Sequence, residues 1–248
     1  MKIIIAKNYS QLSKKAAAVA LNQINNNPQS VLGLPTGSTP LGMYKNLAKA
    51  CKNKKVDFKK VTAFNLDEYV GLAPSQPQSY HYYMFNNLFN HININHQKIN
   101  IPNGLAKDIK KHCHKYERKI KKAGGFDLMI LGVGQNGHIG FNEPGASFNS
   151  ATHLVNLTPD TISANSRFFK SKNDVPKKAI TIGLKTIMSA KKIILLASGR
   201  NKAAIIAKMI TGQISKNIPA SVLHRHKNVT LIIDNAAASI LSSKHFNN

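Results

Sequence analysis

A glycine-rich loop that follows a buried apolar run is the feature that most limits how this chain can fold. The run at 126–131 is typical of a buried strand, and Gly132, Gly134, Gly137 and Gly140 follow it closely. Glycines let a backbone turn sharply and approach a ligand. Parallel α/β sheets place their ligands at the carboxyl ends of strands. The segment therefore predicts an α/β protein with a site at a strand end.

The same loop carries two side chains suited to proton transfer. His138 supplies an imidazole, a group that can exchange protons near neutral pH, and Glu143 supplies a carboxylate in the same loop. Either residue alone is compatible with a solvated surface turn. Together on one glycine-built loop they favour acid–base chemistry.

Strand and helix patterns alternate along the chain. We expect strands at 1–7, 31–34, 61–65, 126–131, 179–183, 192–197 and 229–234, the first of them buried. We expect helices at 11–26, 41–50, 79–92, 107–122, 184–190, 201–210, 219–224 and 236–241. Repeated strand–helix units predict an α/β fold with a mainly parallel, twisted sheet and helices on both faces. No linker or composition break is present, so residues 1–248 are predicted to form a single domain.

The segment between the second strand and its helix is rich in small hydroxyl residues. It reads Pro35-Thr-Gly-Ser-Thr-Pro40, and proline is a favourable first residue of a helix. Such a loop places backbone N–H groups at the positive end of the helix dipole, which suits a phosphate. Alternatively, Thr36 and Ser38 only cap the helix. The Walker and dinucleotide patterns are missing, so both interpretations stay open.

Two acids follow the strand at 61–65. Asp67 is a candidate general base, because that strand would carry it to the ligand edge of the sheet. Alternatively, Asp67 and Glu68 cap a helix or neutralise basic neighbours. The chain has only 10 Asp and Glu residues in total, so the placement of these two and Glu143 in motif-like segments favours a functional role. The aromatic stripe at 79–92 is interpreted as core packing.

Two cations are further candidates for an anion site. Lys202 lies in the strand-to-helix turn 198–202 and could help to hold a phosphate, although a solvated lysine is the alternative in a lysine-rich chain. Arg167 could cap a helix or bind an anion.

The charge balance is unusual. Lys and Arg total 35 against 10 Asp and Glu, a formal net charge of +25. Such a charge is compatible with nucleic acid or another polyanion as a partner. The lysines are scattered in short runs, however, and no zinc-ligand spacing, RNP-like aromatic motif or basic-region heptad is present. No specific nucleic-acid partner is therefore predicted.

The sequence also gives expectations about compartment. Cys51 and Cys113 match no metal or redox spacing. No apolar segment has the length of a membrane span, and the first residues lack the pattern of a signal peptide. A cytoplasmic location without membrane association is expected.

Taken together, these segments resemble the glucosamine-6-phosphate deaminase family of sugar-phosphate isomerase–deaminases. The matching segments are 33–40, 64–72, 79–80, 132–145, 164–169 and 199–202. The resemblance implies a Rossmann-like sheet with a small lid over the site. It also implies conversion of glucosamine 6-phosphate to fructose 6-phosphate and ammonia, without a metal or redox cofactor.

The resemblance also implies roles for individual residues. His138 would open the pyranose ring, with Glu143 orienting its imidazole, and Asp67 would move a proton between carbons 2 and 1 through an enolamine. The phosphate would be held by Gly37, Ser38, Thr39, Arg167 and Lys202.

Two departures from the family pattern bear on these roles. Asn136 stands where some members have an aspartate, so we expect an amide that still fixes the imidazole, a less basic histidine and an active enzyme. Larger members bind N-acetylglucosamine 6-phosphate between subunits through basic residues, and the corresponding segment 149–155 has no Lys or Arg. We therefore expect a monomer or small homo-oligomer without that allosteric site.

Two alternatives remain at this stage. One is a sugar-phosphate lactonase of the same fold, similar to 6-phosphogluconolactonase. The long segment that follows His138 and the acids at 67–68 favour the deaminase instead. The other is a polyanion-binding or sugar-sensing protein, a possibility raised by the net charge of +25.

Overall fold

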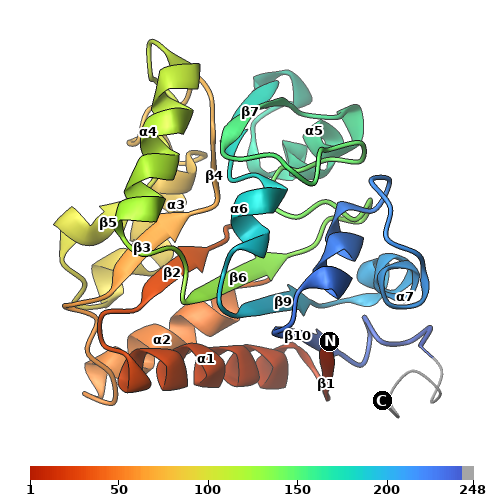
Figure 1. The fold of residues 1–248 in the computed structure, drawn as a ribbon, viewed down its shortest axis with the longest axis horizontal. Coiled ribbons are helices and arrows are strands. Elements are labelled where there is room, and N and C mark those ends of the chain that lie inside the picture. The colour runs from red at the N-terminus through yellow and green to blue at the C-terminus, as the bar shows by residue number, and fades with distance from the viewer. Residues whose placement is uncertain (242–248) are drawn as a thin grey trace.

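A parallel sheet of 7 strands forms the centre of the computed structural model, which describes residues 1–241 (Figure 1). In spatial order its strands are β1 (Lys2–Ala6), β10 (Val229–Asp234), β9 (Ile193–Ala197), β6 (Leu128–Gly132), β2 (Val31–Leu34), β3 (Thr62–Asn65) and β5 (Ile99–Asn100). Every neighbouring pair in this sheet is parallel. The predicted mainly parallel α/β fold is confirmed.

Helices cover both faces of this sheet (Figure 1). The α-helices are α1 (Tyr9–Asn26), α2 (Leu41–Lys52), α3 (Tyr80–Asn87), α4 (Ile109–Lys122), α5 (Pro159–Asn165), α6 (Leu184–Met188) and α7 (Ala203–Thr211). Short 3-10 helices are η1 (Phe89–His91), η2 (His96–Lys98), η3 (Ser166–Phe168), η4 (Lys172–Asp174), η5 (Arg200–Lys202) and η6 (Pro219–Arg225).

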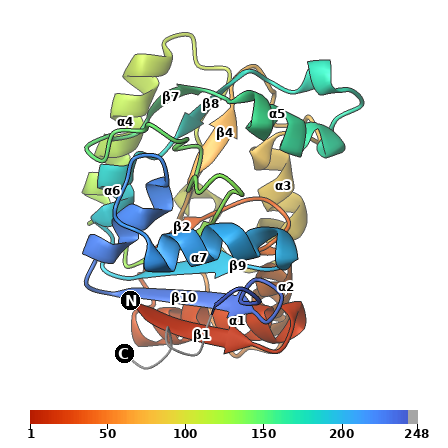
Figure 2. The same cartoon turned by 90° about the vertical axis from the view of Figure 1, so that its right-hand side faces the viewer.

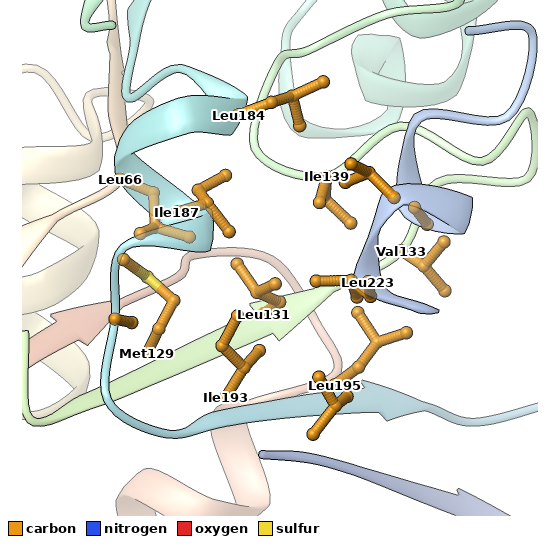
Figure 3. Packing of buried hydrophobic residues seen from close by; sticks show 14 of the residues in the cluster. Leu66, Met129, Leu131, Val133, Ile139, Leu184, Ile187, Ile193, Leu195 and Leu223 are labelled. Carbon is orange, nitrogen blue, oxygen red and sulfur yellow. The ribbon is translucent and has the colours of Figure 1, made fainter. Parts of the chain in front are cut away.

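The central strands are buried on both faces of the sheet. Alternate residues along each strand point to opposite faces, and each face packs in its own hydrophobic cluster. In β6, Leu128 and Ile130 pack with α1 and α2, whereas Met129 and Leu131 pack with α4, α6, α7 and η6. This follows from the two-residue repeat of a strand. Figure 3 shows part of the second cluster, in which the side chains of β6 and β9 meet Ile187 of α6. An unbroken apolar run is therefore the correct sequence signature for a central parallel strand.

A smaller antiparallel sheet stands beyond the main one and forms the predicted lid together with α5, η3 and η4 (Figure 2). Its strands are β4 (Asp67–Tyr69), β8 (Lys178–Thr181) and β7 (His153–Asn156), in that spatial order. The strand expected at 179–183 thus forms, but it pairs in this sheet and not in the parallel one. Neither β4 nor β7 is among the strands expected from the sequence, because both depend on pairing with β8 and their own residues carry no clear strand pattern.

Two further expectations were wrong. The first strand, β1, is not buried: it lies at the sheet edge and pairs only with β10, so Ile5 is half-exposed. The segment 236–240 forms consecutive turns after β10 and not a helix. The start of α1 differs slightly from the expected one, because Asn8 caps this helix. The helix α2 begins at Leu41 as expected, with Pro40 as its N-cap and not as its first helical residue.

Across residues 1–241, none of the helices combines the length and the apolar character that crossing a membrane would require.

We expect Leu195→Ala, in the centre of β9, to lower the free energy of unfolding by about 2–5 kcal/mol, because it leaves a cavity among close-packed side chains. Leu195 is 0% exposed, whereas Leu154 on β7 is 43% exposed and provides a matched control. Leu154→Ala should change stability by less than about 0.5 kcal/mol. Urea unfolding of the three proteins measures both effects, and equal losses in the two variants would contradict this description of the core.

Candidate active site

A cavity of about 780 Å³ opens where β2, β3, β6 and β9 end, between the parallel sheet and the lid. All the predicted site residues except Glu143 line it: Gly37, Ser38, Thr39, Asp67, Asn136, His138, Arg167 and Lys202. Glu143 lies directly behind His138. The structure therefore gathers into one place side chains that are widely separated in the sequence.

Tyrosine hydroxyls hold the carbonyl oxygens of the loop between β2 and α2. Three hydroxyls donate to three loop carbonyls at 2.5, 2.5 and 3.1 Å: Tyr44 to Pro35, Tyr83 to Gly37 and Tyr9 to Ser38. These bonds turn the carbonyl dipoles toward the protein. A loop held in this way can present its N–H groups to an anion.

The N–H groups of this loop are available for a ligand. Within the described part of the chain, the backbone nitrogens of Gly37, Ser38 and Thr39 donate to no acceptor, and Gly37 has a φ of 93° that suits glycine. Within residues 1–241 neither Thr36 nor Ser38 caps α2, so the alternative that they only cap this helix is wrong. The Gly42 N–H in the first turn of α2 donates instead to the Tyr9 hydroxyl at 2.7 Å. Open N–H groups at a helix start are typical of a phosphate site.

Two cations face the same cavity from opposite sides. Lys202 belongs to the turn after β9, and Arg167 belongs to η3 in the lid. Burial and, to a smaller extent, the positive charge of Arg167 lower the pKa of the Lys202 ammonium. Neither cation has a carboxylate partner among residues 1–241. Paired cations beside open N–H groups are suited to hold a dianion.

Asp67 is a buried carboxyl without a cationic partner. Its side chain is 6% exposed, and within residues 1–241 its Oδ1 has no hydrogen-bond partner. Burial, with a smaller contribution from the nearby Glu68, raises the pKa of Asp67 to about 8. Such a carboxyl is a much stronger base, once ionised, than an exposed aspartate.

Glu68, unlike the adjacent Asp67, is fully engaged in hydrogen bonds to backbone N–H groups. Its carboxylate accepts hydrogen bonds from the backbone N–H groups of Tyr69, Tyr80 and His81, at 2.8, 2.9 and 2.9 Å. The last two belong to the first turn of α3. The interpretation of the acid pair as a helix cap is therefore correct for Glu68, but Asp67 makes no such contact.

His138, Glu143 and Asn136 form a connected group. The Nδ1 atom of His138 lies 3.4 Å from Oε2 of Glu143, and the Asn136 amide donates to the same oxygen at 2.8 Å. Burial alone would raise the pKa of Glu143, but the adjacent His138, Thr161 and Asn136 outweigh it and lower that pKa to about 2. The Asn136 side chain thus donates a hydrogen bond to the Glu143 carboxylate and accepts one from the backbone N–H of His138. The expectation that its amide fixes the imidazole by a direct hydrogen bond was wrong.

Several residues of this site are not among those predicted from the sequence. Tyr80 lines the cavity and stacks on Phe141, with ring centroids 5.9 Å apart, whereas the sequence pattern at 79–92 predicts core packing alone.

Asp234 fixes the turn after β9 by accepting hydrogen bonds from Ser198 Oγ and the Gly199 N–H. An acid at the end of a predicted parallel strand was the available signal for Asp234. No sequence signal pointed to the hydroxyls of Tyr9, Tyr44 and Tyr83.

Comparison with known proteins agrees with this geometry. The family model described as glucosamine-6-phosphate isomerases/6-phosphogluconolactonase matches residues 6–232. The chain belongs to this family. The resemblance found in the sequence is thereby confirmed.

Two family members that are highly identical to this chain are both named glucosamine-6-phosphate deaminase. A Clostridium novyi (strain NT) protein named glucosamine-6-phosphate deaminase is 60% identical over 97% of this chain and 100% of its own length. A Thermoanaerobacter sp. (strain X514) protein of the same name is 58% identical over 97% of this chain and 95% of its own length.

Solved structures of the family share the fold. One described as a monomeric glucosamine-6-phosphate deaminase matches with a TM-score of 0.95 and 46% identity, covering 97% of this chain and 100% of that one. The 6-phosphogluconolactonase from Trypanosoma cruzi matches with a TM-score of 0.78 and 21% identity, over 97% of each chain. At 21% identity, the match to the second structure shows a shared fold only.

We expect Asp67→Asn to stabilise the protein at neutral and alkaline pH. The pKa of Asp67 is about 8 in the folded state against 3.8 for an ordinary aspartate, so the unfolded chain ionises this group first. The wild type therefore loses up to about 1.4 kcal/mol of stability per pH unit between about pH 4 and 8, and the variant does not.

Thermal unfolding at about pH 4, 7 and 9 measures this difference, which should be near zero at the lowest pH and largest at the highest. Asp160→Asn changes an exposed carboxyl that lines the same cavity and serves as the control. Parallel stability curves for the wild type and Asp67→Asn would contradict the prediction.

Proposed function

We propose that this protein converts glucosamine 6-phosphate to fructose 6-phosphate and ammonia. The observation that carries the proposal is the placement of a buried, partnerless carboxyl, Asp67, and a histidine–carboxylate pair, His138 and Glu143, around one cavity with a dianion site. An isomerisation needs a base for a carbon-bound proton and a separate group for a hydroxyl proton. The names of the 58–60% identical relatives support the same substrate.

The phosphate end of the substrate would lie against the loop after β2. The N–H groups of Gly37, Ser38 and Thr39, together with Arg167 and Lys202, would hold the dianion through charge-assisted hydrogen bonds. Binding this non-reacting group fixes the sugar relative to the acids and bases, and so lowers the entropic part of the barrier.

Ring opening would come first. His138 lines the cavity and has its Nδ1 atom directed at Glu143, which leaves the other ring nitrogen for the sugar. Its imidazole would move the proton of the ring-closing hydroxyl, and the Glu143 carboxylate, ionised at any physiological pH, would stabilise the imidazolium that forms.

Isomerisation and deamination would follow on the open chain. Asp67 would remove the proton from carbon 2 to give an enolamine, and then return it to carbon 1 to give an imine. Addition of one water to the imine and loss of ammonia yield the ketone. The net reaction breaks a carbon–nitrogen bond with consumption of water, so the enzyme would be classed as a hydrolase.

The environment of Asp67 suits this step. A proton on carbon is far less acidic than a carboxylic acid, so a base with a pKa of about 8 is better matched to it than an ordinary aspartate. Burial provides that basicity and at the same time lowers stability, a trade-off common at active sites.

A monomeric assembly without the intersubunit allosteric site belongs to the same proposal. The relative with 46% identity is described as monomeric, and the segment 149–155 has no Lys or Arg. A cytoplasmic location also stays a prediction from the sequence.

The decisive test incubates the purified protein with glucosamine 6-phosphate and measures ammonia and fructose 6-phosphate together. We expect equal amounts of both, and a loss of about 10²- to 10⁴-fold in rate for Asp67→Asn, because the variant lacks the base. Asp108→Asn is the control, since Asp108 caps α4 on the surface and asparagine is an equally good cap.

Absence of both products from the folded wild-type protein would contradict the proposed function. Hydrolysis of 6-phosphogluconolactone in that case would favour the lactonase interpretation.

We expect hyperbolic kinetics that N-acetylglucosamine 6-phosphate does not activate, because the segment 149–155 has no Lys or Arg to bind its phosphate. Initial rates over a range of substrate concentrations, with and without the acetylated sugar phosphate, measure this. Sigmoidal kinetics that become hyperbolic on its addition would contradict the non-allosteric assignment.

A further inference from the structure

The two oxygens of the Glu143 carboxylate face different parts of the protein. Oε2 lies beside His138 and Asn136, as described above. Oε1 accepts hydrogen bonds from two threonine hydroxyls of the lid, at 2.5 Å from Thr161 and 3.3 Å from Thr158. One carboxylate therefore joins the glycine loop after β6 to the first helix of the lid.

The shorter of these two bonds is buried and lies at the cavity. Thr161 is 3% exposed, and it lines the same cavity as His138. Thr158 is the N-cap of α5, and its hydroxyl also accepts a hydrogen bond from the Thr161 N–H at 3.3 Å. A hydrogen bond to a buried carboxylate is among the stronger ones in proteins, so Thr161 restricts how Glu143 can rotate.

The same helix leads directly to a phosphate ligand. α5 ends at Asn165 and η3 begins at Ser166, so Arg167 is held by the element that carries Thr161. No loop intervenes between the two. The position of this short helical segment therefore affects both Arg167 at the phosphate end of the cavity and Glu143 at its acid–base end.

We propose that Thr161 is a positioning residue that holds the Glu143 carboxylate toward His138. The proposal rests on the proposed deaminase function for its kinetic consequences. Its structural part, the control of Glu143 by Thr161, stands on the geometry alone.

The kinetic test compares Thr161→Val, which keeps the shape but loses the hydroxyl, with Thr161→Ser, which keeps the hydroxyl. We expect kcat for Thr161→Val to fall about ten- to a hundredfold, and KM and the inhibition constant of inorganic phosphate to stay within about twofold. Thr161→Ser should recover most of the activity. Thr211→Val, at the exposed end of α7, controls for the loss of a threonine hydroxyl elsewhere.

A double-mutant cycle tests whether Thr161 acts through Glu143. In a Glu143→Ala background, Thr161→Val should have no further effect on kcat, because the group that it positions is gone. Losses that add would overturn the proposal, as would a Thr161→Val enzyme with wild-type kcat or one with kcat and phosphate affinity reduced alike.

A carboxyl ¹³C NMR titration gives a readout that needs no turnover. The only other glutamates are Glu68 and Glu117, which makes the Glu143 signal straightforward to assign. Because the hydrogen bond from Thr161 helps to lower the pKa of Glu143, that pKa should be higher in Thr161→Val and close to the wild-type value in Thr161→Ser. An unchanged titration would overturn the proposal. An inactive wild type with a shifted titration would instead remove only the deaminase function.

Discussion

Parallel pairing of β2, β3, β6 and β9 is the constraint on which the rest of this structure depends, because it brings their carboxyl ends to one edge of the sheet. The segments that follow these strands carry the N–H groups at 37–39, the buried Asp67, His138 and Lys202. Helices packed on both faces keep the strands in register, and the short antiparallel sheet with α5 closes the remaining side of the cavity. The cavity thus results from the sheet direction, and the loops supply its chemistry.

Two carboxyls at this edge have opposite properties for one physical reason. Asp67 is buried and, among residues 1–241, has no cationic partner and no hydrogen-bond donor at Oδ1, and its pKa is raised to about 8. Glu143 is also buried, but His138, Asn136 and Thr161 surround it, and its pKa is lowered to about 2. The protein thereby obtains a carboxyl that can carry a proton and one that stays ionised, a division of roles typical of acid–base enzymes.

Much of this arrangement could be predicted from local sequence. The apolar runs at 126–131 and 192–197 gave strands close to their observed bounds, and the loop at 35–40 was placed between a strand and a helix. The lid sheet could not be predicted in this way, because β4 and β7 gain their pairing from β8, which is far away in the sequence. The exposed edge position of β1 was missed for a similar reason: burial of a strand depends on its neighbours, and β1 has only one.

The sequence by itself determined the parallel α/β class, the candidate acid–base residues and the segments that could bind a phosphate. These follow from local order, since a run of apolar residues, a glycine turn or a small-residue loop restricts its own backbone. Only the tertiary structure decided which neighbours each group has. It gave Asp67 and Glu68 different hydrogen-bond partners, gave Glu143 its hydroxyl partners from α5, and set three tyrosine hydroxyls behind the loop at 35–40. Contacts between distant segments form only when the whole sheet is assembled, so no local pattern records them.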